Sequence, residues 1–406
     1  MCFFIRGNKA NRRNRRMKKK LLSVLLVAAM AVSTFVACGS SASSDSSSAT
    51  TTEGAAETEA ASDFRIAMIT DSGDITDQSF NQTTYEAIQA FSAETGADFQ
   101  YYKPADNTDD DRVAAFENAV ADGYNVVVCP GYLFAAMIAE VADTYPDVTI
   151  IALDCGEGDF ADAGMTEIPS NVCAFTYQEE LAGYMAGYAV VKEGYTKLGF
   201  LGGIAVPAVI RYGYGFVAGA DKAAEELGNS SEVEVNYVYG GQFQGDEAIT
   251  ATMDSWYSNG TEIVFACGGG IYTSACEAAV KADGHVVGVD VDQSGVIHDQ
   301  YDVEGLCVTS AMKGLAATVE ATLTDVVNGN WDAHAGKIEN LGLVSGTDPS
   351  LNYVQLPTDT WTMQNFTVDD YNTLVSQMYD GTITVDVSID AMPTTTIKVT
   401  EFDNIH

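Results

Sequence analysis

Polar and aromatic side chains follow short β-branched runs of this sequence, where they could recognise a small molecule. The run at 65–70 is followed by DSGDITDQSFN, and later runs are followed by PGY, GGQF and GGG or end in aspartate. Carboxylates accept hydrogen bonds from hydroxyl and N–H groups, and aromatic rings stack against flat partners. The candidate ligand-binding residues are Asp71, Phe80, Asn81, Tyr132, Asp154, Phe243, Gly268, Gly269, Asp290 and Lys313.

The pattern favours binding over catalysis. The sequence contains no HExxH, GxSxG or P-loop motif, and its four histidines are scattered. Apart from Cys2 and Cys38, the six cysteines form no CxxC pair, and most lie within or beside apolar runs, as buried thiols do. A disulfide between two of these cysteines stays an alternative, because exported proteins can form disulfides. We expect no catalytic residue, no metal and no cofactor.

Apolar runs alternate with amphipathic stretches from residue 63 onward, which predicts an α/β fold. Such strands belong to parallel sheets covered on both faces. About 340 residues are too many for a single hydrophobic core, so we expect two doubly wound lobes. The predicted strands are 65–70, 99–102, 125–129, 148–154, 171–177, 197–201, 233–239, 262–266, 285–290 and 306–310. The predicted helices are 81–95, 108–122, 135–145, 179–191, 214–227, 246–258, 274–281 and 312–328.

The candidate residues should gather at one edge of these sheets. In open α/β sheets, ligands bind just beyond the carboxyl ends of the strands. If two lobes face each other across that edge, the carboxylates, rings, glycines and single ammonium line one cleft.

The N-terminus predicts export. Residues 1–37 hold a basic start, an apolar run at 21–36 and a small residue before Cys38, as in a signal peptide with an N-terminal extension. The FVAC sequence resembles a bacterial lipobox, so we expect Cys38 to be lipidated. Residues 38–62 are mostly Ser, Ala, Thr and Glu, which indicates a flexible tether between the anchor and the folded part.

Charge narrows the class of partner. The nine cationic residues before Cys38 leave with the leader, so the mature chain keeps 11 of 20 Lys and Arg against 57 Asp and Glu. Its formal charge of −46 excludes nucleic acid and disfavours anionic ligands such as nucleotides. A neutral or cationic ligand fits better.

Several segments together resemble the basic membrane protein family of bacterial lipoproteins. They include DSGDITDQSFNQ, VVVCPGYLF, AGYMAGYAVV, CGGGIYTSA, VVGVDVDQS and VTSAMKG, in this order, and the resemblance spans 64 to about 346. It implies a type I periplasmic-binding fold whose two lobes are joined by a hinge. It also implies a monomer that carries a purine nucleoside to an ABC permease and its ATPase, anchored on the outer face of the cell membrane. The lobes would comprise 63–175 with 310–340 and 176–309 with 341–406.

The resemblance also implies roles. Phe80 and Phe243 would stack on opposite faces of the base, and Asp71 and Asn81 would hydrogen-bond it. Asp290 would accept from the ribose hydroxyls. The resemblance further implies that Lys313 would contact ribose or base, with Asp154 a further candidate from the first lobe. Gly268, Gly269 and Gly270 would let the backbone approach the ligand.

Other interpretations stay open. Asp71 and Asn81 could be turn and cap residues, the phenylalanines could be core residues, and the glycines could form only a tight turn. A sugar or another small polar solute could fill the same fold. A cell-surface nucleoside hydrolase or a signalling or adhesion lipoprotein without a transport partner are alternatives of other classes.

Overall fold

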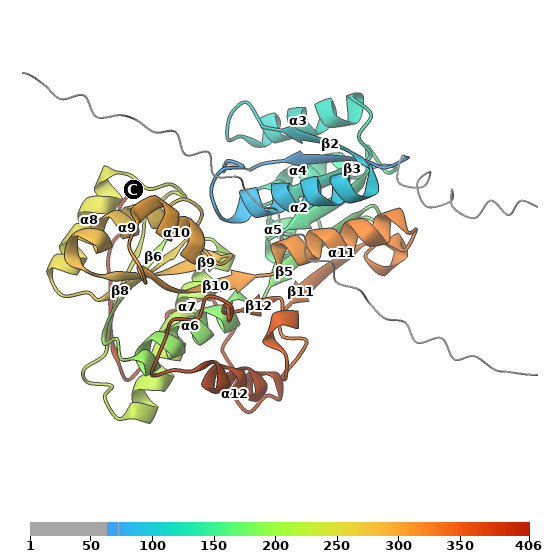
Figure 1. Cartoon of the computed structure of the whole chain (residues 1–406). Coiled ribbons are helices and arrows are strands. Elements are labelled where there is room, and N and C mark those ends of the chain that lie inside the picture. The colour runs from blue at the N-terminus through green and yellow to red at the C-terminus, as the bar shows by residue number, and fades with distance from the viewer. Residues whose placement is uncertain (1–62, 72) are drawn as a thin grey trace, which may run out of the picture. The chain divides into compact units, whose positions relative to one another are not determined.

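The computed structural model describes residues 63–71 and 73–406, and it contains two sheets (Figure 1). We call the six-stranded sheet, in the order β11-β5-β4-β3-β1-β2, sheet A. Every strand pair in sheet A is parallel. Its strands are β1 (Arg65–Ile69), β2 (Asp98–Tyr102), β3 (Val126–Pro130), β4 (Thr149–Leu153), β5 (Val172–Tyr177) and β11 (Lys337–Leu341).

The seven-stranded sheet, sheet B, has the order β12-β10-β9-β8-β6-β7-β13. Only the short β12 is antiparallel, to β10, and β13 joins β7 in parallel. Its strands are β6 (Lys197–Gly202), β7 (Glu234–Tyr239), β8 (Ile263–Cys267), β9 (His285–Asp290), β10 (Cys307–Lys313), β12 (Val354–Gln355) and β13 (Lys398–Glu401).

An α-helix lies between successive strands everywhere except between β11 and β12, as parallel pairing requires. Figure 1 shows α11 beside α2 although the two are far apart in sequence, and their residues are in contact. The helices are α2 (Phe80–Thr95), α3 (Asp109–Ala121), α4 (Phe134–Val141), α5 (Glu157–Asp162), α6 (Glu179–Glu193), α7 (Pro207–Leu227), α8 (Glu247–Ser258), α9 (Tyr272–Ala282), α10 (Ser294–Tyr301), α11 (Leu315–Val327) and α12 (Val368–Tyr379). Two short 3-10 turns lie at Trp331–Ala333 and Pro349–Leu351.

Helices α6 and α7 pack unusually closely because glycines line their contact. A Cβ atom on Gly183 would lie 2.1 Å from the Tyr212 carbonyl oxygen, and one on Gly215 would lie 2.1 Å from the Glu180 carbonyl oxygen. Larger residues would therefore push the helices apart. This close packing brings the first turn of α6 next to Arg211 of α7, whose Nε donates to Glu179.

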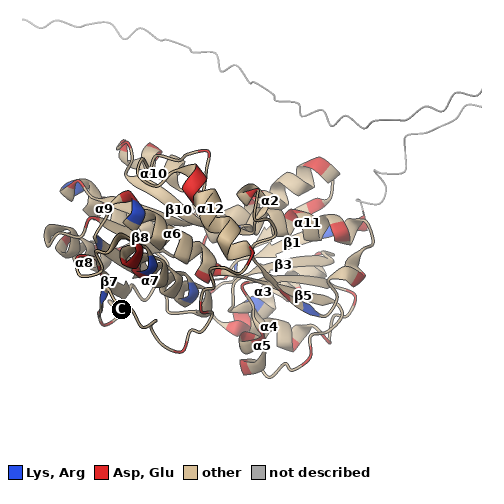
Figure 2. Cartoon of the chain, turned by 90° about the horizontal axis from the view of Figure 1, so that it is seen from below, with Lys and Arg blue, Asp and Glu red and all other residues tan. Residues whose placement is uncertain are grey.

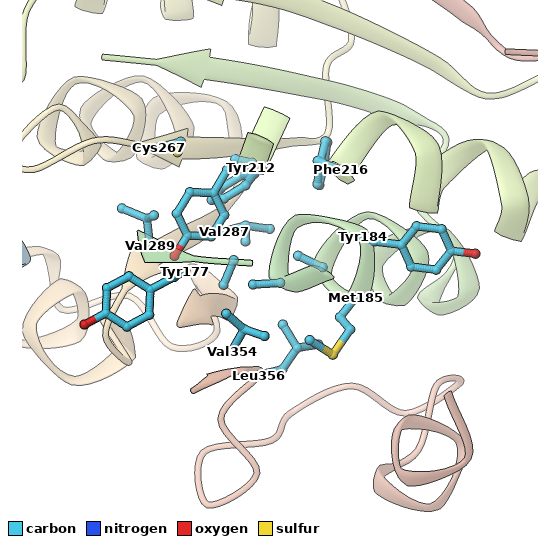
Figure 3. Packing of buried hydrophobic residues seen from close by; sticks show 14 of the residues in the cluster. Tyr177, Tyr184, Met185, Tyr212, Phe216, Cys267, Val287, Val289, Val354 and Leu356 are labelled. Atoms are coloured by element: carbon cyan, nitrogen blue, oxygen red, sulfur yellow. The ribbon is translucent and has the colours of Figure 1, made fainter. Parts of the chain in front are cut away.

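The core is apolar on both faces of the sheets. Figure 3 shows part of it, where sheet B residues such as Val287 and Val289 lie near Met185 of α6 and Phe216 of α7. All four side chains are fully buried or nearly so. Burial of this kind stabilises the fold by about 25 cal/mol per Å² of apolar surface removed from water. The central strands, such as β3 and β8, consequently read as continuous apolar runs.

The predicted α/β class with parallel sheets is confirmed, whereas some element bounds were wrong. The helix expected from Met312 begins at Leu315, because Met312 and Lys313 continue β10 and pair with β12. Helix α7 begins at Pro207 rather than Tyr214, since proline is compatible with the first helical turn. Elements α5, α10, α12, β11, β12 and β13 were not predicted.

The division into lobes remains a prediction. Strand β5 continues to Tyr177 and β10 to Lys313, each a few residues past the expected change of lobe. The expected signal peptide, Cys38 and the tether up to residue 62 lie outside the described residues. Within the described ranges, no helix combines the length and apolarity that crossing a membrane needs.

Candidate functional site

A cavity of about 440 Å³ contains all ten residues that the sequence singled out. Asp71, Tyr132 and Asp154 follow β1, β3 and β4 of sheet A, and Asp290 and Lys313 end β9 and β10 of sheet B. The structure thus brings the carboxyl ends of strands from both sheets to one cavity, as the rule for open α/β sheets requires. Its size lies in the range of small-molecule sites.

Lys313 lies at the centre of the charged groups. Its Nζ donates to Asp154 Oδ2 at 2.5 Å and lies 3.5 Å from Glu179 Oε1 and 3.8 Å from Asp290 Oδ1. Burial alone would lower the pKa of Lys313, but these carboxylates, Asp154 foremost, raise it above its usual value. The ammonium therefore stays charged. It also lies 4.8 Å from the centre of the Phe80 ring, within cation–π range.

Asp290 connects the end of β9 to the segment before α2. Ser79 Oγ donates to Asp290 Oδ2 at 2.5 Å, and Gln293 Nε2 donates to the Gln78 carbonyl oxygen at 3.1 Å. Burial raises the pKa of Asp290, although Lys313 and Ser79 oppose that shift. These bonds join the end of β9 and the segment after it to residues 78 and 79, directly before Phe80 at the start of α2.

Three residues at these contacts hold a left-handed backbone, which is uncommon without glycine. Asp290 has φ +66°, Asp154 has φ +57° and Gln78 has φ +56°. Conformations of this kind persist only where surrounding structure fixes them, and they concentrate at ligand sites.

Asp71 and Asn81 form the polar end of the cavity next to α2. Asp71 Oδ1 accepts from the Gly73 amide at 2.8 Å and from Asn81 Nδ2 at 3.4 Å. Removal from bulk water raises the pKa of Asp71 to about 6. Asp77 accepts the amides of Ser79 and Asn81 at 3.0 Å each, and so fixes the N-terminus of α2.

The glycines after β8 make room for Phe243. A Cβ atom on Gly268 would lie 2.9 Å from the Phe243 ring, and one on Gly203 would lie 2.4 Å from it. Gly268 and Gly269 also have φ values of +144° and +52°, which favour glycine. In this structure the glycines therefore make room for an aromatic side chain, and the close approach of their backbone to a ligand stays a prediction.

Sequence reasoning missed several cavity residues. Arg211 and Tyr212 of α7 line the cavity, and Glu179 of α6 contacts the lining residues Arg211 and Lys313. Of these three, only Glu179 could have been found from the sequence, because it follows the end of β5 by two residues. Arg211 Nε donates to Glu179 Oε2 at 2.6 Å, and Glu179 has no exposed side-chain surface. Ile389, far along the chain, also lines the cavity, although no spacing in the sequence indicated it.

Among the residues that the structure describes, three buried polar atoms of the cavity lining have no hydrogen-bond partner. They are Asn81 Oδ1, Asp154 Oδ1 and the Tyr212 hydroxyl. Buried polar atoms are nearly always paired with protein or water, so an unpaired group calls for an explanation. A polar ligand in the cavity would supply the missing partners. Within residues 63–71 and 73–406, no cluster of His, Cys, Asp and Glu could hold a metal.

Comparison with known proteins identifies the family. Residues 64–381 match the profile of Bmp, described as ABC transporter substrate-binding protein PnrA-like. The chain belongs to the Bmp family. This confirms the family suggested by the motifs. Bmp proteins are extracytoplasmic substrate-binding components of ABC transporters. Such substrate-binding components are not a class of enzymes.

Individual relatives agree with the assignment. The nucleoside-binding protein BmpA of Lactococcus lactis is 25% identical over 245 residues, which is 57% of this chain and 65% of that protein. The chain thus spans just under two thirds of the Lactococcus protein. Basic membrane protein A1 of Borrelia garinii is 26% identical over 297 residues, which is 72% of this chain and 80% of that protein.

A solved structure shares the fold of this Bmp chain. It is an ABC transporter solute-binding protein from Aeropyrum pernix, with 18% identity and a TM-score of 0.61. The similarity covers 79% of this chain and 87% of that chain. The predicted type I periplasmic-binding fold is therefore confirmed.

Proposed function

We propose that this chain is a lipid-anchored carrier that captures a purine nucleoside in the cavity and delivers it to an ABC importer. The coarser statement, that it is a substrate-binding protein of an ABC transporter, follows from its family. The single observation that carries the proposal is the lining of the cavity. Two phenylalanines and several incompletely paired polar groups gather around one space.

The aromatic residues favour a flat ligand. Phe80 begins α2, and Phe243 lies in the loop after β7, so the two rings come from segments attached to different sheets. Each ring is only partly buried and is free to cover a ligand face. Stacking on a base contributes about 1–3 kcal/mol per ring. A ligand held by both rings would favour closure of the two halves.

The polar groups favour hydroxyl and N–H donors. The unpaired Asp154 Oδ1 and Asn81 Oδ1 are both acceptors. A ribose and a purine edge each present donors of this kind. Hydrogen bonds to charged groups contribute about 1.5–3 kcal/mol, and a ligand that lacks the donors would leave the acceptors unpaired. Discrimination against such ligands should follow.

The charges disfavour a phosphorylated ligand. The cavity is lined by two cationic residues, Arg211 and Lys313, and both are already paired with carboxylates. Asp and Glu also outnumber Lys and Arg in the chain, and Figure 2 shows both red acidic and blue basic positions scattered over the ribbon. The acidic residues that line the cavity are Asp71, Asp77, Asp154, Glu157, Asp159, Asp162 and Asp290. A neutral nucleoside fits this field better than its monophosphate.

The anchoring part of the proposal rests on sequence. Cys38 would carry the lipid after removal of residues 1–37, and residues 38–62 would hold the binding domain off the membrane. The printed name of the Lactococcus relative, a nucleoside-binding protein, supports the choice of ligand.

Mass spectrometry of small molecules that copurify with the protein, followed by a thermal-shift panel, tests the function. We expect inosine, guanosine or adenosine to raise the melting temperature, because a bound ligand stabilises the native state by RT ln(1 + [L]/Kd). Stabilisation by sugars alone would favour the sugar-binding alternative. Release of free base from an incubated nucleoside would favour the hydrolase.

A further inference from the structure

Residues 382–406 lie beyond the segment that the Bmp profile matches. In Figures 1 and 2 the chain end lies beside α8, so the segment after α12 returns to the β7 side of sheet B. One residue of this segment, Ile389, lines the cavity. The segment therefore contributes a residue to the cavity wall, although it lies outside the region that the family profile matches.

Both ends of the segment are fixed to the body of the protein. At its start, the Ile383 amide donates to the Gln377 carbonyl oxygen of α12 at 2.9 Å. At its other end, the amides of Thr396 and Ile397 donate to Asp221 Oδ1 at 2.7 and 3.0 Å. Strand β13 then pairs with β7.

The middle is free of such links. Within the described part of the chain, the hydrogen bonds of residues 384–394 are local, such as Ser388 N to Asp386 Oδ1 at 2.9 Å. These residues form neither helix nor strand. Val387 is 64% exposed, whereas Ile389 is only partly exposed and faces the cavity. Segments with few backbone hydrogen bonds open at low cost in free energy.

The final residues of the same segment support the loop that carries Phe243. The Ile405 amide donates to the Tyr239 carbonyl oxygen at 3.0 Å, and His406 Nε2 lies 2.8 Å from Asp246 Oδ2. Gln242 Nε2 donates to the same Asp246 oxygen at 2.9 Å. The C-terminus is thus built against the loop on which the proposed stacking ring stands.

We propose that residues 384–394, which we call the strap, form one movable wall of the cavity, and that Ile389 is a specificity-determining contact for the ligand. Val206, Pro207 and Val209 also line the cavity and provide further apolar surface. The strap is held at both ends by hydrogen bonds, and between them Val385 and Met392 pack against the core while the hydrogen bonds are only local. The part around Ile389 can therefore move away to admit a ligand and return to cover it. This inference rests on the proposed use of the cavity as the ligand site.

Two alanine variants test the strap, with inosine as the probe. Ile389→Ala removes side-chain surface that faces the cavity, and we expect the Kd to rise about tenfold, or about 1.4 kcal/mol. The loss should appear mainly as faster dissociation in stopped-flow measurements. Val387→Ala is the matched control, because it makes a similar change in the same strap on an exposed side chain, and it should leave the Kd unchanged.

Hydrogen exchange on the unmodified protein gives a second test that needs no variant. We expect amides of 384–394 to exchange rapidly without ligand and to be protected when inosine is added. Equal affinities of Ile389→Ala and the parent protein, or a strap whose exchange ignores bound inosine, would overturn the inference. If the parent protein binds no purine nucleoside, the proposed function fails, and D-ribose and D-galactose replace inosine in the same experiments. Binding of neither class overturns both proposals.

Discussion

Replacement of Lys313 by methionine removes a buried charge and leaves a side chain of similar length. The ammonium is nearly inaccessible, with 3% of the side chain exposed, and its shortest contact is with Asp154 Oδ2 at 2.5 Å. The change therefore alters electrostatics with little change in packing. The loss in free energy of unfolding caused by this substitution shows whether the charge cluster is organised around Lys313.

The structure indicates how much stability should be lost. Glu179 would keep Arg211 at 2.6 Å, and Asp290 would keep the Ser79 hydroxyl. Within the described part of the chain, the Asp154 carboxylate would keep no hydrogen-bond partner, because Lys313 is the partner of Oδ2 and Oδ1 has none. Removal of one member of a buried ion pair costs about 3–5 kcal/mol. Since 13% of the Asp154 side chain remains exposed, we expect a loss at the lower end of this range, about 3 kcal/mol.

Urea unfolding at pH 7.5, followed by circular dichroism, measures this free energy. Lys281→Met is the control, because Lys281 and Asp254 form an exposed pair at 2.9 Å that should contribute at most about 1 kcal/mol. Adding Asp154→Asn to Lys313→Met should recover part of the loss, since it removes the charge left without a partner.

The stability that Lys313→Met loses relative to the parent protein should also depend on pH. Burial already raises the pKa of Asp154 to about 6, and removal of Lys313 raises it further. A carboxyl whose pKa is higher in the folded than in the unfolded state binds more protons when folded, so its penalty grows as pH rises. The variant should approach the parent protein as pH falls from 7.5 toward 5. A loss below 1 kcal/mol at pH 7.5, or no effect of Asp154→Asn, would refute the reasoning.

Two further outcomes concern the ligand. Phe80→Ala and Phe243→Ala should each weaken inosine binding about 5- to 150-fold, corresponding to about 1–3 kcal/mol, in calorimetric titrations. Tyr379→Ala, at a 52% exposed position outside the cavity, should have no effect, and equal affinities for all three variants would contradict stacking. Inosine affinity should also fall as pH drops from 7 to 5, because burial raises the pKa of Asp71 to about 6 and its ionised form is the better acceptor. Asp71→Asn should flatten this profile, and an unaltered slope would exclude Asp71 as the titrating contact.

Much of the fold could be read from the sequence because local patterns determined it. Strands such as β9 are continuous apolar runs that end at turn residues, and the observed bounds of β9 equal the predicted ones. Of the edge strands, β2 was predicted, whereas β11, β12 and β13 were not. β11 and β13 lie at sheet edges with exposed, charged residues, so neither shows the apolar run of a central strand. Their pairing is decided by distant residues.

The candidate site was predictable where the strand-end rule applies. Asp71, Asp154 and Asp290 each end or follow a strand, and all three line the cavity. The rule has no means of finding Tyr212, whose place depends on the close packing of α6 and α7. The strand-end rule also cannot identify Ile389, because this residue follows no strand and lies in the segment that leads to β13 and its pairing with β7.

Calorimetric titration of the mature protein with inosine and with inosine 5′-monophosphate, under identical buffer and salt, tests the central claim most directly. The acidic cavity with its paired cations predicts one tight site for inosine and binding at least tenfold weaker for the monophosphate. Equal affinities for the two compounds, or tighter binding of the monophosphate, would contradict the account of an uncharged nucleoside held between two rings.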